Sequence, residues 1–132
     1  MKYEKTETLL ALYRVGRRVK FAAKAGSTDS MLTAAILIGL EDAPVTLSEL
    51  GEHLAMKPAA MSEQIAKLEE EKLVGKKTGK DKRAKILSLT ANGKKAAAQL
   101  REALEEHGAG IFSRLAAPEI ALLHKLLQRL AV

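Results

Sequence analysis

The sequence has no cysteine and no tryptophan, and its only aromatic residues are two tyrosines and two phenylalanines among 132 residues. Without cysteine, the chain cannot form disulfide bonds, sense redox state through a thiol or bind zinc through cysteine. The three histidines, His53, His107 and His124, are scattered and lack the close spacing of metal ligands. We interpret each as a surface or half-buried side chain, and we expect no metal and no cofactor.

The sequence also has no long apolar segment. The best candidate, residues 31–40, is about half of the roughly 20 residues that a membrane-spanning helix needs, so it is interpreted as a buried helix. The first 20 residues mix Lys, Glu and Arg with Leu and do not resemble a signal peptide. We therefore expect a cytoplasmic protein without a membrane partner.

Three features of enzymes are missing as well: a glycine-rich phosphate loop, zinc-ligand spacing, and a nucleophile with a plausible base. The chain is therefore not expected to be an enzyme. Its 132 residues are enough for one domain, residues 1–132, that buries a hydrophobic core without the help of disulfide bonds.

The positive charge is concentrated in one part of the chain. The net charge is +6, but residues 72–101 carry ten Lys or Arg against one acid, whereas residues 41–71 carry eight acids against two bases. No basic stretch has a strongly apolar opposite face with aromatic anchors, as a membrane-surface helix would have. The asymmetry therefore favours a nucleic acid as partner.

Apolar residues recur at spacings of three and four along most of the chain, which predicts a mostly helical α+β fold. Capping signals support individual helices: Thr46 precedes Glu49 by three residues, Pro58 suits a first helical turn, and Thr90 precedes a long apolar pattern. The third and fourth helices are separated by a turn of the length found in a helix-turn-helix. The predicted helices span residues 4–24, 31–41, 46–55, 58–71 and 90–115, and a last helix starts at 117 with an apolar stripe that reaches residue 130.

A basic β-hairpin follows the helix-turn-helix. Residues 73–78 and 83–89 alternate apolar and polar side chains around a turn at 79–82, which predicts a two-stranded wing and hence a winged helix-turn-helix. Lys82 or Arg83 is expected to enter a minor groove, and Asp81 to orient the Arg83 guanidinium. The alternative is a solvated hairpin whose edge is protected by lysines. The candidate DNA-binding residues of the wing are Lys80, Asp81, Lys82 and Arg83.

The N-terminal residues of the fourth helix are candidates for DNA readout, because a helix in the major groove presents its first turns to the base edges. Ser62 and Gln64 carry hydrogen-bonding groups suited to bases, and the methyl groups of the two alanines suit a thymine methyl. The two lysines suit phosphates. Ordinary solvent exposure on a surface helix explains the same residues. The candidates are Lys57, Ala59, Ala60, Ser62, Gln64 and Lys67.

Three stretches, TLSELGEHL, AAMSEQIAKLEEEKLV and DKRAKILSLTANG, carry a family resemblance. Residues 30–93 resemble the MarR family of bacterial winged-helix transcription regulators. The most specific part is an acid-x-arginine at the wing tip, followed by Leu-Thr and a nearby Gly; Asp81, Arg83, Leu89-Thr90 and Gly93 occupy those places. The C-terminal stretch RLAAPEIALLHKLLQRL is similar to the last helix of the family.

The resemblance implies a DNA-binding lobe at residues 30–93 and a dimerisation lobe made of residues 1–24 and 94–132. It further implies a homodimer that binds a pseudo-palindromic operator in double-stranded DNA, under the control of a small effector that is often an aromatic acid. We expect the protein to act as a repressor. The few aromatic residues suggest an effector pocket around Tyr13, Arg17, Phe21 and Met31, although core packing explains its apolar members equally well.

The fourth helix departs from the family pattern. Family members commonly have Ser or Thr where Ala59 and Ala60 stand, and a basic or neutral residue where Glu63 stands. These departures, together with the acidic stretch at 41–71, leave an alternative function open. In it, the chain keeps the winged-helix fold as a protein-interaction or dimerisation module without specific DNA binding.

Overall fold

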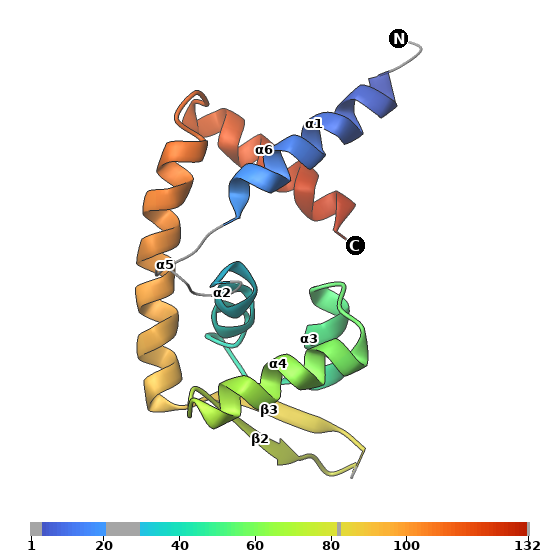
Figure 1. The fold of residues 1–132 in the computed structure, drawn as a ribbon, viewed down its shortest axis with the longest axis vertical. Helices are drawn as coiled ribbons and strands as arrows, with labels where there is room; N and C mark the ends of the chain where they lie inside the picture. The colour runs from blue at the N-terminus through green and yellow to red at the C-terminus, as the bar shows by residue number, and fades with distance from the viewer. Residues whose placement is uncertain (1–3, 21–29, 82, 132) are drawn as a thin grey trace.

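The computed structural model describes residues 4–20, 30–81 and 83–131, and its fold is mostly helical with one small antiparallel sheet (Figure 1). The sequence-based fold class is confirmed. The helices are α1 (Glu4–Val19), α2 (Ser30–Gly39), α3 (Leu47–His53), α4 (Pro58–Glu70), α5 (Ala91–Ile111) and α6 (Ala117–Leu130), and the strands are β1 (Val45–Thr46), β2 (Val74–Thr78) and β3 (Lys85–Leu89).

The core lies where α2 meets α4 and the sheet. Ile36 and Leu37 of α2 are fully buried, as are Met61 and Ile65 of α4 and Leu87 of β3. An apolar helix without a polar face can be stable only when neighbours surround it, and α2 takes that central place. The inner faces of α4 and β3 are thereby fixed, which leaves their opposite faces for solvent or a partner.

The sheet has three strands in the order β1-β3-β2, all antiparallel. The hairpin of β2 and β3 follows the prediction, with Val74 opposite Leu89 and Thr78 opposite Lys85. The sequence did not predict β1, in which Val45 pairs with Leu87. Two residues are too few to show the alternation that identifies a strand.

The helix-turn-helix is built from local signals. The Thr46 side chain accepts a hydrogen bond from the Glu49 N–H at 3.1 Å and so caps α3, as predicted. Helix α3 ends at His53, two residues before the predicted boundary, and Ala55 turns the chain with a φ of 54°. Pro58 then occupies the first turn of α4, where a missing N–H costs no hydrogen bond.

Thr90 joins the winged helix to α5. Its hydroxyl donates a hydrogen bond to the Lys72 carbonyl at 2.7 Å and accepts one from the Gly93 N–H at 3.0 Å. Its backbone N–H donates to the Leu73 carbonyl. One side chain therefore connects the segment after α4, the end of β3 and the first turn of α5.

Helix α5 runs from the sheet to the far end of the molecule, where α1 and α6 lie (Figure 1). It passes through Gly108 and Gly110 without interruption and ends at Ile111, so the predicted extension to residue 115 was wrong. Near its end, His107 Nε2 lies 3.1 Å from the Val19 carbonyl oxygen of α1.

Helices α1 and α6 each have an apolar stripe but contain no buried residue. Exposure of this many large apolar side chains is unusual for a monomer. No described helix is long and apolar enough to cross a membrane. The exposed large apolar residues on these two helices are Leu9, Leu10, Leu12, Tyr13, Val15, Leu122, Leu126, Leu127 and Leu130.

Gly93 has no room for a side chain, because a Cβ atom there would lie 1.9 Å from the Leu73 carbonyl oxygen. We expect Gly93→Ala to lower the free energy of unfolding by about 3 kcal/mol, since backbone must move to relieve the overlap. Gly110→Ala is the matched control, because its Cβ would meet nothing within 4 Å.

We expect this control to raise stability by about 0.5 kcal/mol, because alanine loses less conformational freedom in a helix than glycine. Urea unfolding followed by circular dichroism measures both changes. Equal stability of the two variants would contradict the assignment of Gly93 as a packing constraint.

Candidate nucleic-acid interface

The outward face of α4 carries the side chains predicted to read DNA. Met61, Ile65 and Leu68 are buried on the inner face, and this fixes the rotation of the helix. Gln64 is half-buried, which restricts its reach more than the sequence indicated. The exposed candidates are Lys57, Ala59, Ala60, Ser62 and Lys67, and Glu63 is exposed on the same helix.

The wing lies beside α4 in the structure, on the side of the molecule away from α1 and α6 (Figure 1). Lys76 of β2 and Glu69 of α4 form an ion pair of 3.4 Å between the two elements. The structure therefore brings the predicted recognition helix and the predicted wing together.

The wing tip is organised by Asp81. Its carboxylate accepts a hydrogen bond from the Arg83 backbone N–H at 3.1 Å, and its carbonyl accepts one from the Ala84 N–H at 2.9 Å. Asp81 thus shapes the turn through backbone groups. Between these two described residues the structure gives no ion pair of the carboxylate with the Arg83 guanidinium, which differs from the predicted pairing. Lys80, Asp81 and Arg83 are exposed, and Lys82 lies outside the described residues.

Lys85, at the base of the wing, was not among the predicted DNA-binding residues. Its ammonium group donates a hydrogen bond to the Thr78 hydroxyl at 3.3 Å across the hairpin. The side chain is half-buried, so this one cation of the wing binds the opposite strand of the hairpin.

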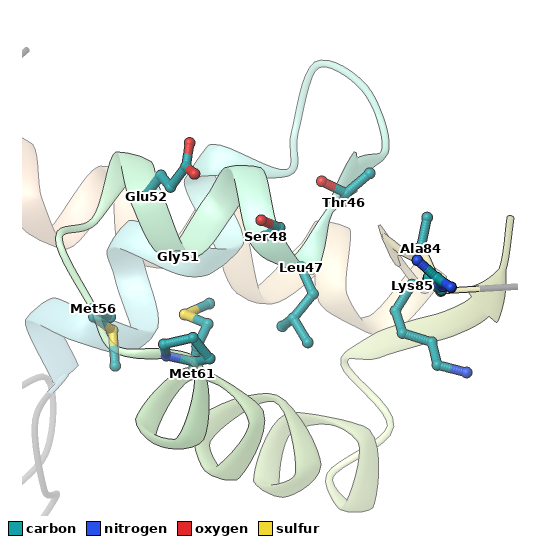
Figure 2. A pocket seen from close by; sticks show the side chains of 11 residues that line it. Thr46, Leu47, Ser48, Gly51, Glu52, Met56, Met61, Ala84 and Lys85 are labelled. Atoms are coloured by element: carbon teal, nitrogen blue, oxygen red, sulfur yellow. The ribbon is translucent and has the colours of Figure 1, made fainter. Parts of the chain in front are cut away.

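An apolar cavity of about 350 Å³ lies between α3, α4 and the base of the wing. Figure 2 shows Leu47 between the two methionines Met56 and Met61 on one side and the wing residues Ala84 and Lys85 on the other. The sequence analysis did not identify this cavity. The cavity forms because the base of the wing packs beside α3 and α4, and sequence spacing does not specify this packing.

The predicted effector residues occupy two places. Arg17 donates a 3.4 Å hydrogen bond to the Tyr13 hydroxyl, and its guanidinium lies 5.9 Å from the ring centre, on the exposed surface of α1. Met31 is half-buried at the start of α2, and Phe21 lies outside the described residues. Tyr13 and Arg17 are brought together, but on a helix that has no buried residue.

A second cavity, of about 580 Å³, lies between α2, α5 and α6 and is lined by Ile38, Arg101, Phe112 and Ile120 among others. The Arg101 guanidinium forms an ion pair with Glu41, which follows α2, with a 3.1 Å hydrogen bond from Nε. The hydrogen bonds and charge of Glu41 raise the pKa of Arg101 above its already high ordinary value. Arg101 therefore stays charged at the edge of this cavity.

The histidines give no sign of a metal site. His53 and His124 are exposed, and His107 is half-buried beside the Val19 carbonyl. Within residues 4–20, 30–81 and 83–131, no group of three or more His, Asp or Glu side chains is arranged to hold a metal ion.

Residues 30–93 match the family model of the winged helix DNA-binding domain. This match and the arrangement of α3, α4 and the wing define the class: a winged-helix DNA-binding protein. A sequence comparison with curated proteins gives no match.

Solved structures resemble the chain over nearly its full length. A probable transcriptional regulator from Pseudomonas aeruginosa is 26% identical, with 91% of this chain and 93% of that chain covered and a TM-score of 0.74. AbsC, a MarR family regulator from Streptomyces coelicolor, is 20% identical, with coverage of 96% and 90% and a TM-score of 0.78. CouR from Rhodococcus jostii, solved with p-coumaroyl-CoA, is 18% identical, with coverage of 92% and 88% and a TM-score of 0.81.

The chain therefore contains a winged helix DNA-binding domain at residues 30–93, and over nearly its full length it has the fold of regulators of the MarR family. The resemblance identified from the wing and the helix-turn-helix is thereby confirmed. The family is non-enzymatic, in agreement with the expectation from the sequence.

Two substitutions at Asp81 separate its charge from its structural role. Asp81→Asn keeps an oxygen acceptor for the Arg83 N–H and removes a negative charge, so we expect DNA affinity to stay equal or to rise a few-fold. Asp81→Ala removes charge and acceptor together, and we expect affinity to fall below that of the asparagine variant because the turn loses its order. Fluorescence anisotropy with duplex DNA measures both; equal affinity of the two variants would show that the turn hydrogen bond is irrelevant to binding.

Proposed function

We propose that the chain is a homodimeric repressor that binds a pseudo-palindromic operator in double-stranded DNA. One observation carries the proposal: α4, with its exposed N-terminal side chains, and the wing, with its exposed basic tip, lie side by side at the end of the protein away from α1 and α6 (Figure 1). A helix of this kind fits a major groove, and a basic hairpin beside it suits the adjacent phosphates or minor groove.

In this proposal the parts of the interface have different tasks. Lys57 and Lys67 of α4 and the cations of the wing bind phosphates, which fix the position of the protein on the duplex. Ser62 and Gln64 contact base edges. The exposed carboxylate of Glu63 opposes binding, so base reading by α4 is weak and the wing supplies much of the affinity.

The homodimer is proposed from the exposed apolar stripes of α1 and α6. Leu9, Leu126 and Leu130 are 66%, 44% and 71% exposed, and a second copy of the chain would remove such surfaces from water. Pairing through α1, α5 and α6, the proposed dimerisation lobe, leaves both α4 helices and both wings free for the two halves of an operator.

An effector is proposed at the boundary between the winged helix and the helices α5 and α6. CouR, with the same fold, was solved with p-coumaroyl-CoA. In this chain the cavity beside Arg101 has a mostly apolar lining with one cation, Arg101, and one acid, Glu105, which suits a small aromatic ligand with one acidic group better than the exposed Tyr13–Arg17 pair alone. Such a ligand would compete with Glu41 for Arg101 and so disturb the contact between α2 and α5.

Binding to the DNA upstream of the chain's own gene tests the proposal. We expect a preference over scrambled duplex, and we expect the logarithm of affinity to fall linearly with the logarithm of salt concentration, by about 0.9 per phosphate contact. Lys67→Ala should lower this slope by about one contact, while Gln64→Ala should relax base preference. An acidic effector should release the same DNA. Equal affinity for native and scrambled duplex would refute the proposal.

Oligomeric state is tested by Leu126→Asp. The carboxylate would stand at an exposed position of a single chain but would be buried in the proposed dimer, so we expect dissociation to monomers with helicity retained. Ala66→Asp, on the exposed surface of α4 and outside the proposed dimerisation lobe, is the matched control and should stay dimeric. Sedimentation velocity measures the state, and a wild-type chain that sediments as a monomer would refute the homodimer.

A further inference from the structure

Methionine provides the only sulfur atoms of this chain, because the sequence has no cysteine. Peroxides convert the methionine thioether to a sulfoxide, which turns a flexible apolar side chain into a polar one. Among the described methionines, Met61 is only 1% exposed, whereas Met31 and Met56 are half-buried. A small oxidant therefore reaches Met31 and Met56 before it reaches Met61.

Met56 lies on the segment that joins α3 to α4, and it lines the cavity between these helices and the base of the wing (Figure 2). Its backbone N–H donates a 2.9 Å hydrogen bond to the Gly51 carbonyl, and its side chain packs against the buried core. The cavity, of about 350 Å³, is many times larger than the roughly 30 Å³ that a water molecule occupies, and hydrogen peroxide is only slightly larger than water. Met56 thus combines a packing role with access for a small oxidant.

The start of α4 depends on packing more than the other described helix starts do. Threonine hydroxyls cap α3 and α5, and a glutamate carboxylate accepts a hydrogen bond from the backbone N–H that precedes α6. At the start of α4 the N-cap residue is Lys57, whose side chain makes no capping hydrogen bond. The apolar residues around this start therefore have to hold it in place.

Met56 and Met61 occupy the two positions of a hydrophobic staple. Met56 precedes the N-cap residue and Met61 is the fourth residue of α4, and apolar side chains at these positions fix the direction in which the chain enters a helix. Both residues line the same cavity and approach Gly51, where a Cβ atom would lie 3.6 Å from the Met56 carbonyl oxygen and 3.6 Å from Met61 Cγ. A polar oxygen on the Met56 sulfur would weaken the apolar packing at this staple.

From these features we propose that Met56 is a site of reversible oxidation to the sulfoxide, and that this oxidation loosens the first turn of α4. The sulfur donates an electron pair to one oxygen of hydrogen peroxide; an S–O bond forms, the O–O bond breaks and water leaves. Sulfur is oxidised and the peroxide is reduced, so the step needs no further reactant. The sulfoxide oxygen favours water over the apolar lining, which turns the side chain away from the staple.

The consequence for DNA rests on the proposed function. Lys57 and the first residues of α4, which follow Met56 directly, are the residues proposed to meet DNA. When the first turn of α4 loses its fixed position, DNA affinity falls, by roughly fivefold if the loss equals that of a helix cap. The oxidation of Met56 and its effect on α4 do not depend on that function.

Peptide mass spectrometry of the folded, full-length chain after treatment with hydrogen peroxide tests the site. We expect sulfoxide at Met56 well before Met61, and faster amide hydrogen exchange in the first turn of α4 once Met56 is oxidised. The two methionine sulfoxide reductases, one for each epimer, should restore the slower exchange. Oxidation of Met61 as fast as Met56, or exchange that oxidation leaves unchanged, would overturn the proposal.

Matched variants assign the effect to one sulfur. Met56→Leu keeps an apolar side chain of similar volume that cannot be oxidised, and Met31→Leu is the control at the other half-buried methionine. Peroxide should change neither hydrogen exchange in α4 nor DNA affinity in Met56→Leu, whereas Met31→Leu should respond as the wild type does. A response that disappears in Met31→Leu and persists in Met56→Leu would show that the assignment to Met56 is wrong.

Glutamine in place of Met56 imitates the polar sulfoxide without any oxidant. Met56→Gln should weaken binding to duplex DNA roughly fivefold, measured by fluorescence anisotropy, and Met31→Gln should leave it unchanged. If oxidised Met56 speeds exchange in α4 but affinity for DNA stays the same, the proposed regulation is wrong. If the reduced protein binds no DNA, the proposed function fails, and mass spectrometry and hydrogen exchange alone decide the modification site.

Discussion

The hydroxyl of Thr90 links the winged helix to α5, and the relative position of these two parts depends on its two hydrogen bonds. It donates to the Lys72 carbonyl and accepts from the Gly93 N–H, and the absence of a side chain at Gly93 lets α5 start against the Leu73 carbonyl. Lys72 reaches this position with a φ of 63°, a left-handed conformation that is strained for a residue with a side chain. The segment after α4, the wing and α5 therefore meet at one small set of hydrogen bonds.

The hydrogen bonds of Thr90 couple the movement of α5 to that of α4 and the wing. Because the segment after α4 and the end of β3 are both bonded to the start of α5, a tilt of α5 would carry α4 and the wing together. The Arg101–Glu41 ion pair is a second link, between α5 and the residues after α2. In the proposed function, a ligand that breaks this ion pair shifts α5, and the Thr90 hydrogen bonds transmit the shift to α4 and the wing.

Local signals explain how much of this protein was predictable. Caps, helical periodicity and the alternation of the hairpin each involve residues close in sequence, so α3, α4 and the wing were found with their order and approximate bounds. The C-terminal boundary of α5 was missed because the apolar pattern continues past Ile111 while the helix does not. The strand β1 was missed because its only signal is its pairing with β3, some 40 residues later.

The candidate site was predictable in kind but not in detail. Alternation around Asp81 and Arg83 predicted a basic wing, yet it did not reveal that Asp81 bonds to the backbone of Arg83 and leaves the guanidinium available. The half-burial of Gln64 and the cavity under the wing likewise depend on how close two separately predicted elements lie. Distances of this kind arise from packing, which sequence spacing does not encode.

The sequence by itself determined the class of the protein, because helix caps, the helix-turn-helix spacing and the charged hairpin are properties of neighbouring residues. It also showed that the first and last helices have apolar stripes. Only the tertiary structure decided which apolar surfaces are covered. The apolar residues of α2 are enclosed by other elements, whereas the leucines of α1 and α6 remain exposed within one chain. The physical reason is that periodicity reports which face of a helix is apolar, while burial depends on which surface covers it.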